Sequence, residues 1–321
     1  MRSHCFVLLS LVAAWTAFGA VPDGEHTTLF VVVGTGGESQ YDEAFARWAA
    51  NWQKAGVAAG ARVTTIGLAP SPVQDLEQLH AAVQSEPADG SAPVWLVLLG
   101  HGTFDRNDAK FNLRGDDLPV SALAKWIEPI HRPVVVIAAF SSSGAFLNPL
   151  AAPGRIVLTA TKSGAENGFA RFGKYLSETV SDPKADLDHD GQTSLLEAWI
   201  SAAQNVADFY KSEGRLATEH SMLDDNGDGH GTPADWFKGI HVVKKASDAT
   251  LPDGLRAHQI HLLPGAADRA LPAAVRAERD ALELQLAALR ETKGTLPEDE
   301  YYAKIEAVLL HLSRLYQQKK P

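Results

Sequence analysis

Two apolar stretches, Val94–Gly102 (VWLVLLGHG) and Val134–Gly144 (VVVIAAFSSSG), decide the fold of this chain. Each begins with a short run of branched, apolar residues, which is the composition of a strand buried on both faces. Each run then passes into glycine- or serine-rich sequence, where a chain turns. If the two strands are neighbours in a parallel sheet, His101 and Ser141 face one crevice at their carboxyl ends.

Strand and helix patterns alternate around these two stretches. Further elements are predicted, in chain order, at 29–33 (strand), 41–59 (helix), 62–66 (strand), 73–83 (helix), 120–127 (helix) and 155–160 (strand). Apolar strands that alternate with helices are typical of a mostly parallel sheet with helices on both faces, so the fold class is predicted to be α/β. In such sheets the site lies at the carboxyl ends of the strands.

The remaining chain changes character. Residues 172–237 are predicted to be helical and acidic, 251–268 to be a linker, and 269–321 to be a hairpin of two helices broken at Lys293–Pro297. The apolar residues expected to meet within the hairpin are Leu282, Leu284, Leu289, Ile305, Leu309, Leu312 and Leu315. The hairpin is expected either to pack back on the domain or to pair with another chain.

Residues 1–20 have the pattern of a signal peptide. Arg2 supplies a positive start, Phe6–Phe18 an apolar run, and Ala17–Ala20 a small-residue cleavage region. The run is shorter than the roughly 20 residues that span a membrane, although a retained anchor is the alternative. The protein is therefore expected to be exported, to the periplasm or the exterior. Cys5 lies in this segment, so the mature chain is expected to hold no disulfide.

The charge balance excludes some classes of partner. The chain has 29 basic and 39 acidic residues, a formal net charge of −10. Such a balance disfavours nucleic acid and anionic membrane surfaces, so neither is expected as a partner once the signal peptide is removed. Much of the acid is clustered at the spacing of metal-binding loops.

His101 and Ser141 are the residue types of a general base and a nucleophile. Gly100 and Gly102 allow the backbone to turn sharply around His101 and to approach a ligand closely. A serine hydroxyl needs a base and usually a third group that orients the base. The candidates for that third group, by proximity in sequence alone, are Asp105, Asp116 and Asp117. The alternative is a hydrogen-bonded turn histidine beside serines that fill a tight loop.

The order of these motifs resembles the caspase–legumain superfamily, and its legumain-like branch most closely. The matching stretches are Leu98–Gly102 and Ala138–Gly144, and the similarity covers about residues 27–240 of a predicted domain at 21–250. The resemblance implies a caspase-like three-layer sandwich with a peptide cleft. It implies that His101, with Gly102 beside it, takes the place of the catalytic histidine.

The cysteine nucleophile of that superfamily is absent here. Its position falls on Ser141 if Ser143-Gly144 is the anchor of the comparison, or on Phe140 if Ala138-Ala139 is the anchor. Because the histidine of a thiol enzyme is tuned to a partner of lower pKa, the resemblance implies a lost or altered peptidase activity. Two functions are then open: a pseudopeptidase that binds a peptide or protein, or a hydrolase with Ser141 as nucleophile and His101 as base.

A first acidic loop, Asp186–Glu197, matches the twelve-residue calcium loop of EF-hand proteins. Oxygen-bearing side chains fall at positions 1, 3, 5 and 9, glycine at 6, a backbone carbonyl at 7 and glutamate at 12. The candidate ligands are Asp186, Asp188, Asp190, Gln192, Ser194 and Glu197. The weakness of the match is Thr193 at position 8, where a larger aliphatic residue is usual.

A second acidic loop, Asp224–Asp235, repeats the pattern less closely. The candidate ligands are Asp224, Asn226, Asp228, His230, Thr232 and Asp235. Asp235 is shorter than the usual glutamate, and Pro233 is awkward beside it. The alternative for both loops is a solvated acidic turn. The expected cofactor is calcium (Ca2+) in a structural role, where it neutralises clustered carboxylates.

Overall fold

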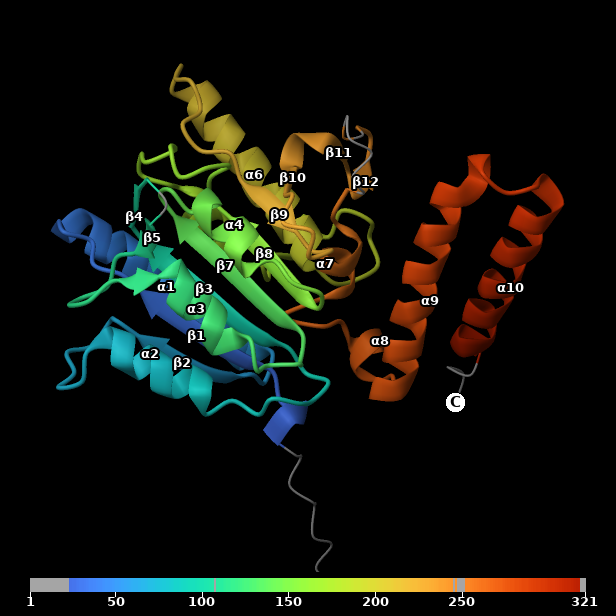
Figure 1. Ribbon diagram of the computed structural model, residues 1–321, viewed down its shortest axis with the longest axis horizontal. Coiled ribbons are helices and arrows are strands. Elements are labelled where there is room, and N and C mark those ends of the chain that lie inside the picture. The colour runs from blue at the N-terminus through green and yellow to red at the C-terminus, as the bar shows by residue number, and fades with distance from the viewer. Residues whose placement is uncertain (1–22, 107, 245, 247–251, 318–321) are drawn as a thin grey trace, which may run out of the picture.

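A computed structural model describes residues 23–106, 108–244, 246 and 252–317 (Figure 1). The predicted signal peptide, including Cys5, lies outside the described residues. Among the helices that are described, none combines the length and the apolar character needed to cross a membrane.

A seven-stranded sheet forms the centre of the molecule, in the order β10-β9-β8-β7-β3-β1-β2. The strands are β1 (Thr28–Val33), β2 (Arg62–Ile66), β3 (Val94–Gly100), β7 (Val134–Phe140), β8 (Arg155–Thr159), β9 (Met222–Asp224) and β10 (Thr232–Pro233). The five longer strands are parallel, and β9 and β10 are antiparallel at one edge. The predicted α/β class with a mostly parallel sheet is confirmed.

The two decisive stretches are neighbours in this sheet. β3 pairs with β7 in parallel, and Gly100 lies opposite Phe140. His101 and Ser141 each follow one of these paired residues, so both lie just past adjacent strand ends. The sheet thus confirms the neighbour relation on which the expected crevice depends.

Helices cover both faces of the sheet (Figure 1). One face carries α1 (Ser39–Ala58), α5 (Phe172–Thr179) and α6 (Leu195–Ser212), and the other α2 (Asp75–Gln84), α3 (Val120–Ile127) and α4 (Gly144–Leu150). Successive strand residues point to opposite faces. Trp95, Val97 and Leu99 therefore join the first core, whereas the residues between them join the second.

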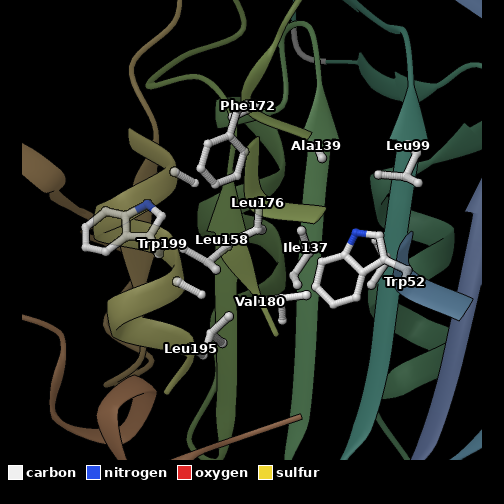
Figure 2. Close-up of a cluster of buried hydrophobic side chains, with 14 of the residues drawn as sticks. Trp52, Leu99, Ile137, Ala139, Leu158, Phe172, Leu176, Val180, Leu195 and Trp199 are labelled. Carbon is white, nitrogen blue, oxygen red and sulfur yellow. The ribbon is translucent and has the colours of Figure 1, made fainter. Parts of the chain in front are cut away.

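The first core holds the sheet rigidly beneath the loops at its carboxyl end. Figure 2 shows Ile137 and Leu158 from the sheet against Phe172 and Leu176 of α5, with Trp199 of α6 beside them. All five side chains are at most 1% exposed. Cutting such an aromatic side chain to alanine typically costs about 3–5 kcal/mol, so the core fixes where the strand ends lie.

Several short strands were not predicted. A small antiparallel sheet contains β4 (Gly102–Asp105), β5 (Asp108–Phe111) and β6 (Leu118–Pro119), and β11 (Phe237–Lys238) pairs with β12 (His241–Val242). The prediction that 172–237 is helical is wrong for β9 and β10. These strands have two to four residues, too few for a periodic pattern, and form because a neighbouring strand offers its backbone.

The C-terminal hairpin consists of α9 (Ala273–Glu291) and α10 (Glu298–Gln317). Its core contains Leu282, Val308, Leu312 and Leu315, with Val275, Leu286 and Leu289 packed against it. Three expected members lie outside this core: Ile305 is only half-buried, Leu309 is 46% exposed, and Leu284 lines a cleft of about 700 Å³ beside the sheet domain. In Figure 1, α9 lies between α10 and the sheet.

The segment before the hairpin is more than a connection. It contains α7 (Leu255–Gln259) and α8 (Ala266–Arg269), and it buries Asp253, Ala257 and Leu262 at 0–2% exposure. The short 3-10 helices are η1 (Asp23–Glu25), η2 (Pro183–Ala185), η3 (Ala234–Trp236) and η4 (Thr292–Gly294). The predicted linker therefore packs as part of the domain core.

Candidate functional site

The hydroxyl of Ser141 is turned toward the backbone of Gly102. Its Oγ accepts from the Gly102 N–H at 3.1 Å and donates to the Gly102 carbonyl at 3.2 Å. The side chain is buried, with 3% exposure. The structure thus brings His101, Gly102 and Ser141 together, but within the described part of the chain no hydrogen bond joins Ser141 to the imidazole.

The imidazole of His101 lies in an aromatic cage. Its ring centroid is 5.0 Å from Tyr41, 5.3 Å from Phe45 and 5.9 Å from Phe169. Burial lowers the pKa of His101, and this effect outweighs a hydrogen bond with the Gly36 backbone, which raises it. The ring is therefore neutral at physiological pH and keeps a lone pair that can take up a proton.

Asp42 is the carboxylate that interacts electrostatically with this ring, and its negative charge raises the pKa of His101. Asp42 also accepts a hydrogen bond from Gly36 N at 2.9 Å. The three aspartates that sequence proximity suggested have other surroundings, since Asp105 and Asp116 are exposed and Asp117 accepts from Leu113 N at 3.3 Å. Asp42 comes from α1, so no local signal could have found it.

Phe140 and Ser143 are committed to packing. The Phe140 ring is fully buried in the second core. Its centroid lies 4.9 Å from the ring centroid of Phe111 and 5.0 Å from that of Phe146. Ser143 Oγ accepts from the backbone N–H groups of Ala160 at 3.0 Å and Thr161 at 3.2 Å. Both side chains therefore tie the turn after β7 to its surroundings.

Ser142 is the residue of this turn that sequence reasoning missed. It adopts a positive φ of 63°, is 2% exposed, and its hydroxyl has no hydrogen-bond partner among the described residues. The positive φ between a strand and a helix resembles the backbone of a nucleophile elbow, but the buried hydroxyl differs from the exposed serine of such an elbow. Its N–H donates to the Glu166 carbonyl at 2.8 Å, while the Glu166 carboxylate lies 2.6 Å from Nδ1 of His220.

The carboxylate of Asp186 organises the turn of the first acidic loop. Asp186 accepts from Asp190 N at 3.2 Å and Gly191 N at 3.0 Å, and Gly191 has the positive φ of 92° that this turn requires. Carboxylate oxygens of Asp186, Asp188 and Asp190 lie within 4.8 Å of one another. The three predicted acids are thus gathered at one point.

Glu197 closes this loop, and it is 1% exposed. Its Oε1 accepts from Leu187 N at 2.7 Å and Asp188 N at 3.2 Å, which are loop positions 2 and 3. Its Oε2 accepts from the N–H and the hydroxyl of Ser194, position 9, both at 2.8 Å. We call a carboxylate with this set of donors the closing carboxylate.

Two further contacts tie the first loop to the segment before the hairpin. His258 Nε2 lies 3.0 Å from Asp188 Oδ2, and it falls within 4.8 Å of the Asp188 and Glu197 oxygens. The Gln192 side chain accepts from Gly265 N at 2.8 Å. His258 was missed by the sequence pattern because it lies some 60 residues beyond the loop.

The second acidic loop has the same internal turn. Asp224, which is fully buried, accepts from Gly227 N at 2.8 Å and Gly229 N at 2.7 Å. Gly229 occupies position 6 with a φ of 77°. Asp228 in turn accepts from His230 N at 2.7 Å. The first six positions therefore resemble those of the first loop, with a positive φ at positions 4 and 6 and a bond from position 6 to the first aspartate. The second donor to that aspartate differs, being position 5 in the first loop and position 4 in the second.

The closing carboxylate of the second loop is Asp253, not the predicted Asp235. Asp253 Oδ1 accepts from the N–H groups at positions 2 and 3, at 2.9 and 3.3 Å. Its Oδ2 accepts from the N–H and the hydroxyl of Thr232, position 9, at 3.1 and 2.7 Å. Asp235 has a side chain that is 71% exposed and pairs with Lys244 at 2.6 Å.

Three carboxylates are buried together beside this loop. Asp224, Asp225 and Asp253 are at most 2% exposed. Burial raises the pKa of all three, and for Asp253 burial together with the charges of Asp225 and Asp224 raises the pKa to about 8. Such a cluster is stable at neutral pH only if protons or a cation neutralise it.

Comparisons with known proteins assign neither a family nor an activity to this chain. No family model matches the sequence, and no curated protein gives a significant match. Among solved structures, the Drosophila initiator caspase Dronc aligns with a TM-score of 0.40 and 13% identity over 65% of this chain and 82% of Dronc. Raptor from Chaetomium thermophilum aligns with a TM-score of 0.36 and 12% identity over 93% of this chain and 25% of Raptor.

Both similarities are too low for any argument about activity. The α/β class therefore rests on the sheet order and on the two helical layers of the structure itself.

Proposed function

We propose that this protein is an exported calcium-binding protein on a caspase-like α/β scaffold, and that the edge around His101 binds a peptide or protein without hydrolysing it. The observation that carries the proposal is the closing carboxylate that recurs in both acidic loops. Glu197 and Asp253 accept from the same loop positions, although one belongs to its loop and the other does not.

Calcium fits this arrangement chemically. It prefers six to eight oxygen ligands from carboxylates, amides and backbone carbonyls. Glu197 and Asp253 each accept four hydrogen bonds, which occupy the roughly four lone-pair sites of a carboxylate, so an ion would replace some of these bonds. The proposed ligands are Asp186, Asp188, Asp190, the Gln192 carbonyl and Glu197 in the first loop, and Asp224, Asn226, Asp228, the His230 carbonyl and Asp253 in the second.

The role proposed for calcium is structural. The second ion would neutralise the buried acids Asp224, Asp225 and Asp253, whose mutual repulsion otherwise opposes folding. Extracellular calcium, at about 1 mM, fills even weak sites. His258 beside the first loop favours a transition metal as the competing occupant, because imidazole suits zinc better than calcium.

Calorimetric titration of the mature protein with calcium tests the metal sites. We expect two bound ions in the wild type, and one in each of Glu197→Gln and Asp253→Asn. The matched control is Asp235→Asn, which also removes one acid from the second loop pattern and is expected to keep two ions. No binding at millimolar calcium, or loss of an ion in the Asp235 variant instead of the Asp253 variant, contradicts the proposal; tighter binding of zinc than calcium at the first loop contradicts calcium as its occupant.

The hydroxyl geometry supports the absence of hydrolysis. Ser141 donates its proton to the Gly102 carbonyl, so the hydroxyl is not poised to pass it to His101. The ligand of this edge is proposed to be a peptide or protein because the resemblance implies a peptide cleft there.

A serine hydrolase is the second candidate function. In that case the backbone conformation and the unpaired hydroxyl of Ser142 favour Ser142, rather than Ser141, as the nucleophile. Turnover of a peptide library by the wild type and by His101→Ala separates the two functions. Equal background rates are expected. A rate that depends on His101 overturns the non-catalytic proposal, and comparison of Ser141→Ala with Ser142→Ala then identifies the reacting serine.

A further inference from the structure

The cleft of about 700 Å³ that Leu284 lines is at the end of the sheet opposite to His101. It is bounded on one side by the residues that come directly before β1, β3, β7 and β8, namely Thr27, Pro93, Pro133 and Gly154. In Figure 1, α8 lies beside this end of the sheet. His101 and Ser141 follow the other ends of β3 and β7, so this cleft is separate from the edge around His101.

The size and the walls of the cleft are those of a small-molecule site. Such sites have volumes of about 300–1,000 Å³ and are lined mostly by apolar side chains, with a few polar groups that orient the ligand. One apolar wall comes from the sheet domain and includes Pro93 and Ile156. The other consists of Ala277, Ala281 and Leu284, which share one side of α9 by their helical spacing and which we call the α9 face. A ligand with an apolar body can therefore be buried between the sheet domain and the hairpin.

The charges around the cleft differ in sign from those of the whole chain. The chain has a formal net charge of −10. The cleft is lined by more arginines than acids, namely Arg256, Arg269, Arg276 and Arg279 against Glu25, Asp268 and Asp280. A positive cleft in an acidic protein favours an anionic ligand.

Two of these arginines are already paired with acids. Arg279 forms ion pairs with Asp268 and with Asp280. Arg276 Nε lies 3.9 Å from the Asp268 carboxylate. These pairs fix the base of the hairpin, and they leave the other two arginines to account for the positive charge.

Two polar side chains beside α7 line the cleft without a partner of their own. Within the described ranges, the guanidinium of Arg256 and the imidazole of His261 make no hydrogen bond and no ion pair. Burial lowers the pKa of the half-buried His261, so the ring is neutral at physiological pH and offers one N–H. A guanidinium and an imidazole N–H are both donors that a carboxylate accepts.

We propose that this cleft binds a small organic carboxylate with an apolar body, whose anionic group lies against Arg256 and His261 and whose body lies against the α9 face. Pairing with the guanidinium orients the ligand, and burial of its apolar body supplies most of the affinity. The site goes beyond the calcium loops and the edge around His101, and it depends on neither.

Fluorescence titration of the mature protein with anilinonaphthalene sulfonate, at about 1 mM calcium, tests the cleft. This dye has apolar rings and one anionic group, and the wild type is expected to bind one molecule saturably. Ala281→Trp, at an exposed position of the α9 face, fills the cleft and is expected to weaken binding about tenfold or more. Ala217→Trp, in a separate pocket of about 160 Å³, is the matched control and is expected to bind as the wild type does. Absence of saturable binding, or unchanged affinity in an Ala281→Trp protein with native circular dichroism, overturns the proposal.

A pair of dyes and a pair of arginine variants test the anionic group. Arg256→Gln is expected to weaken binding of anilinonaphthalene sulfonate about tenfold or more, because a charge-assisted hydrogen bond is lost. Phenylnaphthylamine has the same rings without the sulfonate, and its affinity is expected to be equal in Arg256→Gln and the wild type. Arg215→Gln, at an exposed arginine that does not line the cleft, is the matched control and is expected to leave both affinities unchanged. Equal losses for the two dyes, or no loss for the sulfonate, overturn the recognition of an anion.

Competition with the bound dye tests the carboxylate. Octanoate and naphthoate carry this group on an aliphatic and on an aromatic body. At least one of them is expected to displace the dye, and the better competitor shows which body the cleft accepts. Displacement by neither at millimolar concentration overturns a carboxylate as the ligand.

Discussion

The two acidic loops reach the same geometry by different routes through the sequence. In the first, the closing carboxylate is Glu197, three residues after its partner Ser194. In the second, it is Asp253, which lies 21 residues after its partner Thr232. Both carboxylates are almost fully buried, and both accept from positions 2, 3 and 9 of their loops.

The difference between the loops comes from the element into which each one leads. The first loop leads directly into α6, where Ser194 is the N-cap and Glu197 completes a capping box, so the helix points Glu197 back into its own loop. The second loop leads into β10, which pairs with β9, and then into η3. This path carries Asp235 to the surface and leaves the closing position to a later segment. A loop pattern is therefore complete in sequence only when a helix comes directly after it.

Removal of calcium is expected to have the largest effect, because it acts on both loops. If each Kd is about 10 µM, calcium at 1 mM contributes about 2.7 kcal/mol per site. At about 2–4 °C per kcal/mol for a chain of this size, chelation lowers Tm by about 10 °C or more. Thermal unfolding with and without a chelator measures this, with magnesium added back as the control for charge screening. An unchanged Tm contradicts calcium binding by either loop.

Loss of one closing carboxylate is expected to separate the loops. In calcium, Asp253→Asn and Glu197→Gln should each cost about 2–4 kcal/mol, because each removes a charged acceptor of several buried donors. Amide hydrogen exchange should then speed up in β9, β10 and 252–258 for Asp253→Asn. For Glu197→Gln the change should be confined to 186–197 and the first turn of α6. If both variants showed faster exchange in the same segments, the two loops would not differ in how they are closed.

The hydroxyl at position 9 is expected to matter less, and more in the second loop. Thr232→Val removes a hydroxyl that donates to Asp253 at 2.7 Å and accepts from its N–H at 2.9 Å, for a cost of about 1–2 kcal/mol. Ser194→Ala removes a helix cap, for about 1 kcal/mol. Urea unfolding at saturating calcium measures both. A larger loss in Ser194→Ala would mean that capping, rather than closure, dominates.

The smallest change in calcium affinity and stability is expected at Asp235, and this result tests directly whether Asp235 or Asp253 closes the second loop. Asp235→Glu restores the glutamate that the loop pattern calls for at position 12. Because the side chain lies at the surface beside Lys244, calcium affinity and stability should change by less than about 0.5 kcal/mol. Titration of this variant decides the matter: a tenfold gain in affinity would show that Asp235, and not Asp253, faces the ion.

The regular parts of the fold were predictable from local pattern. The strand predicted at 29–33 agrees with β1 within one residue, β3 and β7 begin where the apolar runs begin, at Val94 and Val134, and α3 has the predicted bounds. The hairpin was predicted, but the placement of Leu309 in its core was wrong, because one heptad stripe faces α9 and the next does not. The edge strands β9 and β10 were not predictable, since pairing with β8 creates them.

The region around His101 and Ser141 was likewise predictable in part. Strand order predicted that His101 and Ser141 lie on adjacent strand ends, because each follows a recognisable buried run. The direction of the Ser141 hydroxyl depends on how Gly102 approaches it. A Cβ at Gly102 would lie 2.5 Å from the Ser141 carbonyl oxygen, so this close contact needs glycine, and no spacing rule could have revealed it.

The sequence by itself determined the parallel sheet, its helical layers and the first acidic loop, because those features are encoded by side chains within a turn or two of one another. Only the tertiary structure decided that Ser141 turns to the backbone, that Ser142 is strained with a hydroxyl unpaired among the described residues, and that Asp253 closes the second loop. The physical reason is burial. Packing the segment around α7 into the core buries the Asp253 carboxylate beside N–H groups that would otherwise lack partners, and this outcome depends on residues that are far apart in the chain.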